Sequence, residues 1–272
     1  MLDQPETITG TLTFAVDIGE KPVTYPEKDV NDPTRATGKY EDREVALHNG
    51  RLIRDQLSLD KEGFILLDST TATTDFYDEE AVKGAYYDEC MAIVKEHTGA
   101  DDIVVIDHTI RVQDEAKRKE MDVRAPVPSV HNDFTDWSGR KRVHDIFPED
   151  EAEDRLTRRV VSVNVWRPIM EPVMTEPLVL CDATTLGAGD LIAADHIYTY
   201  RRGETFRVAH SDGQKWYFFP EMTMSEAVLI KCFDTETDRT RFNAHGAARI
   251  AAPEGVAPRE SIEVRTLAFF ND

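Results

Sequence analysis

The second half of the chain is a series of short apolar segments bounded by residues that favour turns. Eight such segments lie near 127–132, 159–166, 177–182, 193–200, 206–210, 215–219, 226–233 and 262–269. Clusters of Pro, Gly and Asp separate most of them. Segments of this length and spacing predict β-strands that form a sandwich or a closed barrel. One acidic stretch, 149–158, interrupts the series and predicts a short surface helix.

The first part of the chain mixes strand and helix patterns. Residues 9–16 alternate threonine with apolar side chains, as strands do, and 44–68 and 102–111 also contain strand-like segments. Residues 78–96 repeat apolar positions every three or four residues and begin with acidic residues, which predicts an amphipathic helix. The fold class expected from these patterns is mainly β with flanking helices.

Proline, aspartate, threonine and lysine dominate residues 21–42, which predicts an extended arm. No internal repeat divides the chain. We therefore expect one domain over 1–272, in which the strands, arm and helix of 1–126 pack on a β core formed by 127–272.

The charge of the chain restricts its partners. Fifty-two acidic and 32 basic residues give a net charge of −20. A surface this negative repels nucleic acid and anionic membranes. There is no run of about 18 apolar residues to span a membrane, and the start MLDQPETITG does not look like a secretory signal. We expect a cytoplasmic protein with a small-molecule substrate; the sequence does not indicate its oligomeric state.

His131 and Asp133 stand two positions apart in PVPSVHNDFT. Residues i and i+2 of a strand point to the same side, so both side chains are expected to face one metal ion. A third imidazole would complete the facial triad that is typical of non-haem Fe(II) oxygenases. Three protein ligands leave three coordination positions on a six-coordinate iron, two for a bidentate co-substrate and one for dioxygen. Alone, the H-x-D spacing is weak, because a surface histidine and aspartate at a strand end give the same pattern.

A second group near the C-terminus strengthens this interpretation. His245 stands in RFNAHGAARI, and Arg259 and Ser261 follow a short distance downstream. On a strand, Arg259 and Ser261 share a face, where a guanidinium and a hydroxyl can clamp a carboxylate. This pair suits the distal carboxylate of 2-oxoglutarate, whose 2-oxo acid end would chelate the iron. The order H-x-D, distant histidine, R-x-S is more specific than any of its parts.

Other histidines compete for the third ligand position. His210 ends a plausible strand and ranks second, and the remaining candidates are His48, His97, His108 and His196. His245 ranks first because an R-x-S follows it at the expected distance.

The strand motifs also supply candidate substrate contacts, which are Asn164, Trp166, Arg167, Lys215, Tyr217, Phe134 and Thr135. Asn164 and Trp166 share one strand face and Arg167 points to the other. Arg167 either binds a substrate carboxylate or braces a loop. Aromatic residues on strands belong to the core more often than to a pocket wall.

Several of these segments resemble a known family of iron and 2-oxoglutarate oxygenases. The family is the hydroxylase/desaturase group that includes the cephamycin methoxylation component and fungal secondary-metabolite tailoring enzymes. The similar segments are VHNDFT, NVWRPI, PLVLCDATT, KWYFFPEMTMSEAVLIKCFD, the AHGAA around His245 and PRESIEVRTLAFF. They span most of the chain after residue 127, whereas the N-terminal third is only loosely similar.

The resemblance implies a double-stranded β-helix, the jelly-roll fold of cupins, with Fe(II) between its sheets. It implies His131, Asp133 and His245 as iron ligands, Arg259 and Ser261 as 2-oxoglutarate ligands, and O2 as the oxidant. One departure from the family is Gly246, where a bulkier or hydroxyl-bearing residue is expected.

Two other functions fit parts of the pattern. A cupin-type metal dioxygenase or isomerase that needs no 2-oxoglutarate could use the same β architecture, but it would normally show an H-x-H pair, which does not occur here. A non-catalytic β-sandwich binding protein would leave the H-x-D and R-x-S pairs unexplained. The main hypothesis is therefore an oxygenase that hydroxylates, desaturates or oxidatively cyclises a small molecule, one derived from an amino acid or resembling a secondary metabolite.

Overall fold

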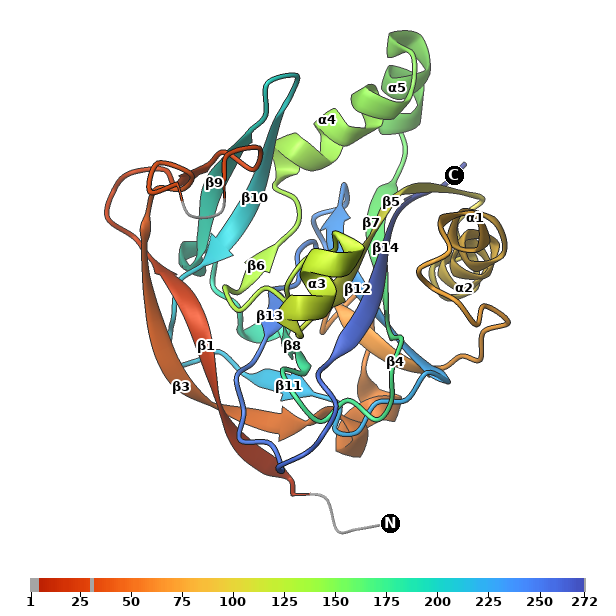
Figure 1. The fold of residues 1–272 in the computed structure, drawn as a ribbon. Coiled ribbons are helices and arrows are strands. Elements are labelled where there is room, and N and C mark those ends of the chain that lie inside the picture. Colours follow the sequence, from red (N-terminus) through yellow and green to blue (C-terminus); the bar gives the residue numbers. More distant parts are fainter. Residues whose placement is uncertain (1–4, 30–31, 272) are drawn as a thin grey trace.

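Two β-sheets that face each other form the body of the protein in the computed structural model, which describes residues 5–29 and 32–271 (Figure 1). Across the larger sheet the order is β1 (Thr7–Val16), β3 (Lys39–Asn49), β11 (Trp216–Phe218), β8 (Leu178–Cys181), β13 (His245–Ala247), β6 (His131–Asn132), β10 (Arg202–Val208), β9 (Leu191–Ile197) and β2 (Val23–Thr24). Across the smaller sheet it is β4 (Phe64–Asp68), β12 (Glu226–Asp234), β7 (Val160–Pro168), β14 (Glu260–Phe269) and β5 (Asp102–Val112). The N-terminal part of the chain thus supplies the strands at the edges of both sheets.

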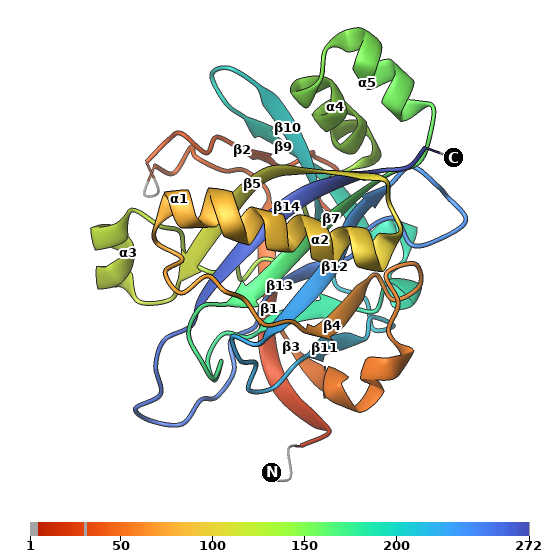
Figure 2. The ribbon, with the colours of Figure 1, turned by 90° about the vertical axis from the view of Figure 1, so that its right-hand side faces the viewer.

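A long helix covers the outer face of the smaller sheet (Figure 2). It consists of α1 (Glu79–Ala81), the π-helical turn η2 (Val82–Tyr86) and α2 (Tyr87–Thr98). The Asp78 carboxylate accepts hydrogen bonds from the first backbone N–H groups, and Gly99, with a φ of 72°, ends the helix. Its apolar side chains pack on those of β7, β12 and β14. The helix predicted over 78–96 is confirmed.

Smaller helices and 3-10 turns lie in the connections between strands. They are α3 (Glu115–Met121), α4 (Asp136–Ile146) and α5 (Glu149–Leu156), with the 3-10 turns η1 (Gly50–Gln56), η3 (Ala183–Thr185) and η4 (Ala188–Asp190). The helix predicted at 149–158 is α5, whereas α3, α4 and β13 lie outside the predicted elements. Of the predicted arm 21–42, residues 30 and 31 lie outside the described residues; β2 and the start of β3 lie within it.

The strand predicted at 127–132 is shorter than expected. Only His131 and Asn132 pair as β6. Pro126 and Pro128 have no backbone N–H to donate to a neighbouring strand, so regular pairing begins after them. The strand that carries His131 is therefore a short segment between the longer β10 and the three-residue β13.

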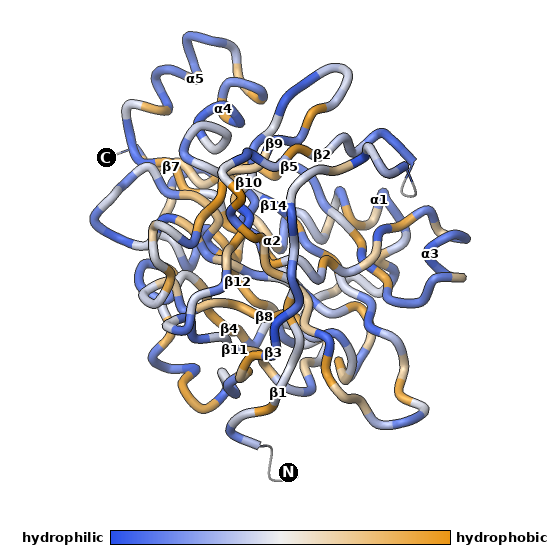
Figure 3. Tube along the Cα trace, turned by 90° about the vertical axis from the view of Figure 1, so that its left-hand side faces the viewer, coloured by the Kyte–Doolittle hydropathy of each residue, from blue (hydrophilic) through white to orange (hydrophobic). Residues whose placement is uncertain are grey.

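The space between the sheets is apolar at one end. Residues of β4, β7, β8, β11 and β12 form the core there, including Trp166, Leu180 and Ile230. In Figure 3 the hydrophobic segments gather towards the middle of the molecule around β8 and β12. No helix in the described parts of the chain is long and apolar enough to cross a membrane. The predicted mainly β fold with flanking helices is confirmed.

Replacing Gly139 with alanine is expected to destabilise the protein. A Cβ at this position of α4 would lie 2.5 Å from Cγ of Phe233 on β12, so the helix could not keep its place on the sheet. Overpacking of this kind costs about 1–3 kcal/mol. The check is the free energy of unfolding in a denaturant titration. Gly189→Ala, whose Cβ would meet no atom within 4 Å, is the control and should be close to neutral.

Candidate metal centre

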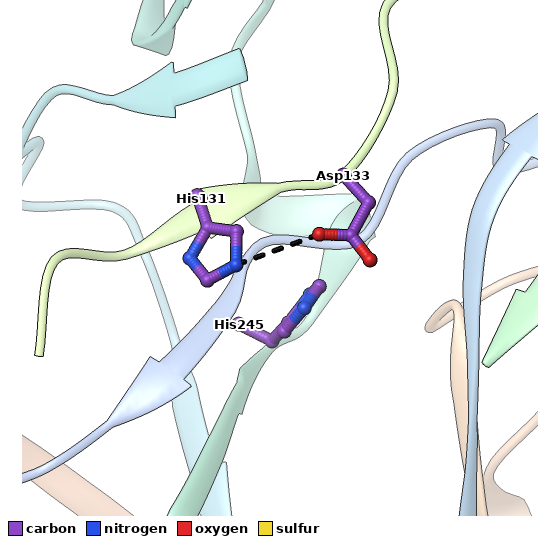
Figure 4. A group of neighbouring side chains, drawn as sticks. All are labelled: His131, Asp133 and His245. Carbon is purple, nitrogen blue, oxygen red and sulfur yellow. Dashed lines mark ion pairs between the residues drawn. The ribbon is translucent and has the colours of Figure 1, made fainter. Parts of the chain in front are cut away.

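His131, Asp133 and His245 converge on one point between the sheets (Figure 4). Their ligand atoms all lie within 4.8 Å of one another, and His131 Nε2 is 3.6 Å from Asp133 Oδ1. His131 begins β6, Asp133 follows directly after it, and His245 begins the neighbouring β13. His131 and Asp133 are thus two residues apart on one chain segment, and His245 is the partner of His131 on the neighbouring strand. A second group able to hold a metal in the described residues, His144 with Glu149 and Glu153, is largely exposed and has no buried orphan atom.

Both imidazoles are held in the tautomer that a metal requires. His131 Nδ1 lies 2.9 Å from the Ser129 carbonyl, and His245 Nδ1 lies 3.0 Å from the Asn243 carbonyl. A carbonyl only accepts hydrogen bonds, so each Nδ1 carries the proton and each Nε2 presents a lone pair. His245 Nε2 is buried without any hydrogen-bond partner. An unpaired buried acceptor costs free energy, and a metal ion at this point would satisfy it.

The charges around the centre favour metal binding. Burial and the neighbouring His245 lower the pKa of His131, so its imidazole is neutral at pH 7. Burial raises the pKa of Asp133, but the positive charge of Arg265 and the hydrogen bond from Asn164 oppose this effect, and the pKa lies below its usual range. Two imidazoles and one carboxylate are the donor set of the non-haem Fe(II) oxygenase site, so the residues present fit that ion.

Asn164 holds the carboxylate of Asp133 in place. Its Nδ2 donates a 2.7 Å hydrogen bond to Asp133 Oδ2, while Oδ1 faces His131. Asn164 is fully buried on β7, in the sheet opposite β6. Asn164 is one of the substrate contacts predicted from the sequence, and in the structure it lies behind a predicted metal ligand.

Asn164→Ala is expected to weaken Fe(II) binding by about 10- to 100-fold, as the loss of groups that orient metal ligands typically does. An anaerobic Fe(II) titration against a competing chelator measures the effect. The matched control is Ser162→Ala, because Ser162 is also fully buried on β7 but donates to the Thr266 carbonyl. Equal affinities in Asn164→Ala and the wild type would contradict the assigned role.

Arg259 and Ser261 lie together at the start of β14. Nε and Nη2 of Arg259 are 3.4 and 3.2 Å from Ser261 Oγ, and Nη1 donates to the Glu176 carbonyl. Arg259 is 2% exposed and stacks on Trp166, and within the described residues it forms no ion pair with a carboxylate. Burial and the nearby Arg111 lower the pKa of Arg259 to about 10. A buried guanidinium without a counter-ion is a ready site for an anion.

Two of the predicted substrate contacts do not fit that role. Arg167 is fully buried on the outer face of the smaller sheet, where its guanidinium bonds to Tyr86, to Ser69 and to the Met224 carbonyl. It braces the connection before the long helix instead of facing the centre. Thr135 caps α4 and uses its hydroxyl on Ser138 and Glu204.

The remaining candidates are mostly core residues. Trp166 supports Arg259, and Tyr217 is packed against Phe64, with its ring 5.6 Å from that of His48. Lys215 is exposed, with its ammonium 5.2 Å from the Tyr217 ring centre. Phe134, directly after Asp133, is partly buried against the apolar core between the sheets.

Arg265 is a charged neighbour of the centre that does not appear among the residues predicted from the sequence. It pairs with Asp107 at 2.6 Å and Glu263 at 3.3 Å, and its charge lowers the pKa of Asp133. Residues 261, 263 and 265 share one face of β14, so the period of two that paired Arg259 with Ser261 could have found it.

The unexpected Gly246 has a steric cause. A Cβ there would lie 3.2 Å from Val130 Cγ1 and 3.3 Å from the Val127 carbonyl oxygen. The close approach of β13 to the segment before β6 therefore favours glycine, and His245 is unaffected.

Comparisons with known proteins agree over most of the chain. The family described as an oxidoreductase/YMDC permease-like domain matches residues 12–269. The hydroxylase/desaturase efuI of Hormonema carpetanum is 31% identical over 99% of this chain and 97% of its own. The Fe(II)/2-oxoglutarate-dependent dioxygenase nvfI of Aspergillus novofumigatus is 31% identical over 87% of this chain and 86% of its own.

A solved structure of the iron and alpha-ketoglutarate-dependent endoperoxidase NvfI covers 98% of this chain and 99% of its own, with a TM-score of 0.87 and 27% identity. This likeness confirms the predicted double-stranded β-helix.

Proposed function

The chain belongs to the oxidoreductase family that contains fungal Fe(II)/2-oxoglutarate-dependent dioxygenases and hydroxylase/desaturases, and on this basis we propose which residues bind its cofactors and what kind of molecule it oxidises. It is a non-haem enzyme that uses Fe(II), 2-oxoglutarate and O2. Neither a cupin-type enzyme without 2-oxoglutarate nor a non-catalytic binding protein accounts for these relatives.

His131, Asp133 and His245 hold the iron. The observation that carries this assignment is the convergence of three ligand atoms within 4.8 Å, with the buried His245 Nε2 left unpaired. When bound, Fe(II) couples the oxidative decarboxylation of 2-oxoglutarate to oxidation of a substrate by O2. The chain itself contributes a fixed carboxylate, held by Asn164, and two imidazoles whose Nε2 atoms are free.

Arg259 and Ser261 bind the distal carboxylate of 2-oxoglutarate. Support comes from the burial of Arg259, from its lack of an ion pair within the described residues and from the position of Ser261 next to it. A guanidinium binds a carboxylate through two parallel hydrogen bonds, which fixes the orientation of the co-substrate as well as its affinity.

The substrate is a small molecule of the secondary-metabolite type. Support comes from the names of relatives, which include hydroxylase/desaturases, an endoperoxidase and an aspirochlorine biosynthesis protein. Hydroxylation places one oxygen atom of O2 in the product and the other in succinate, with release of CO2; desaturation releases water in place of the hydroxyl group.

Residues 1–272 work as one oxygenase domain in the cytoplasm, without nucleic acid or membrane partners. The edge strands that the N-terminal part adds to both sheets support the single domain. The net charge of −20 supports the absence of nucleic acid and anionic membranes among its partners, because the surface repels polyanions. Cys90, Cys181 and Cys232 are buried and free, as expected in a reducing compartment.

Anaerobic addition of Fe(II) and 2-oxoglutarate tests the proposal. A chelated 2-oxo acid on Fe(II) gives a weak visible charge-transfer band, which should appear in the wild type and disappear in His131→Ala. Succinate released on addition of O2 and a panel of small molecules then identifies substrates. The absence of any band in the wild type would contradict the proposal.

A further inference from the structure

A row of three side chains runs across the larger sheet through the metal centre. His245 of β13 is the register partner of His131 of β6, and His131 is in turn the partner of Arg207 on β10. The three strands are neighbours (Figure 1). Directly paired residues point to the same face, and neighbouring strands lie about 4.8 Å apart. Arg207 is therefore the next side chain after the two histidines on the face that carries the centre.

The guanidinium of Arg207 is poorly satisfied by the protein. Its Nε is buried with no hydrogen-bond partner, and Nη2 reaches only His196 Nε2, at 3.5 Å. Within residues 5–29 and 32–271 it forms no ion pair. Arg202, on the same strand, pairs instead with Asp195 at 2.7 Å. A chain with 52 acidic residues thus leaves one cation beside its metal ligands without a counter-ion.

Neighbouring side chains satisfy one another without hydrogen bonds from Arg207, so Arg207 does not hold this region of the fold together. Glu204, the nearest carboxylate along β10, pairs with Lys21 and bonds to Thr135. His196 Nε2 also lies 3.2 Å from Thr205 Oγ1, so its long contact with Arg207 is shared. Arg167, in contrast, uses its guanidinium on four hydrogen bonds to protein atoms.

We propose that Arg207, with His196 beside it, is a binding subsite for a carboxylate that enters the iron centre. The subsite rests on the proposed function, since it needs a ligand bound at His131, Asp133 and His245. Its chemistry is a guanidinium that donates hydrogen bonds to carboxylate oxygens. Two ligands can bring this group: the 2-oxo acid end of 2-oxoglutarate, or an acidic substrate. In either case Arg259, on the opposite sheet, binds the distal carboxylate of 2-oxoglutarate.

Two binding measurements on Arg207→Gln separate these sources. The first is the dissociation constant of 2-oxoglutarate, from the charge-transfer band under anaerobic conditions with saturating Fe(II). The second uses small aromatic and alicyclic carboxylic acids, each paired with its methyl ester, and records the change that they cause in the same band. Arg43→Gln, which removes a half-exposed guanidinium paired with Glu41 on the outer part of β3, is the charge-matched control. Arg207→Lys keeps the positive charge but removes the planar guanidinium, which can donate two parallel hydrogen bonds to one carboxylate.

In Arg207→Gln we expect a loss of at least tenfold, either in the affinity for 2-oxoglutarate or in the preference for acids over their methyl esters. Fe(II) affinity and melting temperature should stay at the wild-type values. Weaker 2-oxoglutarate binding assigns the subsite to the co-substrate. Unchanged 2-oxoglutarate binding with loss of the preference for acids over esters assigns it to the substrate. If 2-oxoglutarate binds normally to Arg207→Gln, and acids gain no advantage over esters that depends on Arg207, the subsite does not exist. A wild type without the band would instead contradict the proposed function.

Discussion

Replacing His245 with glutamine is expected to weaken Fe(II) binding by more than about 100-fold, since the loss of a group that merely orients a ligand already costs ~10–100-fold. Glutamine is close to histidine in length but carries no imidazole, so the variant removes the ligand nitrogen with little change in the volume of the side chain. Succinate formation should fall with the bound iron. Fe(II) affinity is measured by chelator competition, and the melting temperature reports on the fold.

The control for this variant is His210→Gln. His210 was the second-ranked candidate for the third ligand, but its ring packs on Phe14 at 5.1 Å, and it is not part of the convergent group. Its variant should keep the Fe(II) affinity of the wild type. Normal iron binding in His245→Gln together with a loss in His210→Gln would overturn the choice of third ligand.

Local spacing could single out His131 and Asp133 as candidate ligands because their geometry is local. His131 and Asp133 are two residues apart, and a period of two brings them to one face even though regular pairing stops at Asn132. His245 could be ranked only through its distance from Arg259, because β13 consists of three residues with no strongly apolar side chain. The pairing of β13 with β6 is long-range information that no single segment contains.

Elements without an apolar stripe were missed. Ser138, Gly139 and Val143 are the buried residues of α4, and α3 buries none. Helices of this kind show no apolar period of 3.6, so only their capping residues mark them. The long helix over 78–96 and the strands β7 and β12, in contrast, are rich in buried apolar side chains and were predicted with small shifts at their ends.

The face of β7 to which each side chain points could be predicted more reliably than the role of that side chain. Asn164 and Arg167 point to opposite faces of β7 as predicted, yet their partners lie in segments far away in the sequence. Asn164 meets Asp133 from the opposite sheet, and Arg167 meets Tyr86 under the long helix. The sequence could therefore predict which residues face the interior but not which interior residues touch the metal ligands.

Replacing Arg259 with glutamine is expected to weaken 2-oxoglutarate binding by roughly 30- to 4,000-fold, which corresponds to the about 2–5 kcal/mol lost when one partner of a buried, hydrogen-bonded charge pair is removed. Arg259 is almost completely buried and, in the described part of the chain, has no carboxylate of its own to bind. Ser261→Ala removes only a hydroxyl, so it should cost about tenfold or less. Fe(II) affinity without 2-oxoglutarate should stay at the wild-type value in both variants.

The competing anchor for 2-oxoglutarate is Arg111. It is the register partner of Ser261 on β5, and its guanidinium bonds to the Ala125 carbonyl at 3.0 Å. Arg111→Gln is thus the control, because it removes the same positive charge as Arg259→Gln from the same part of the sheet. Arg259 is expected to dominate because two of its nitrogens already face Ser261 Oγ, so a carboxylate there meets donors from both residues. If 2-oxoglutarate binds normally to Arg259→Gln but poorly to Arg111→Gln, the carboxylate lies on the β5 side of this pair.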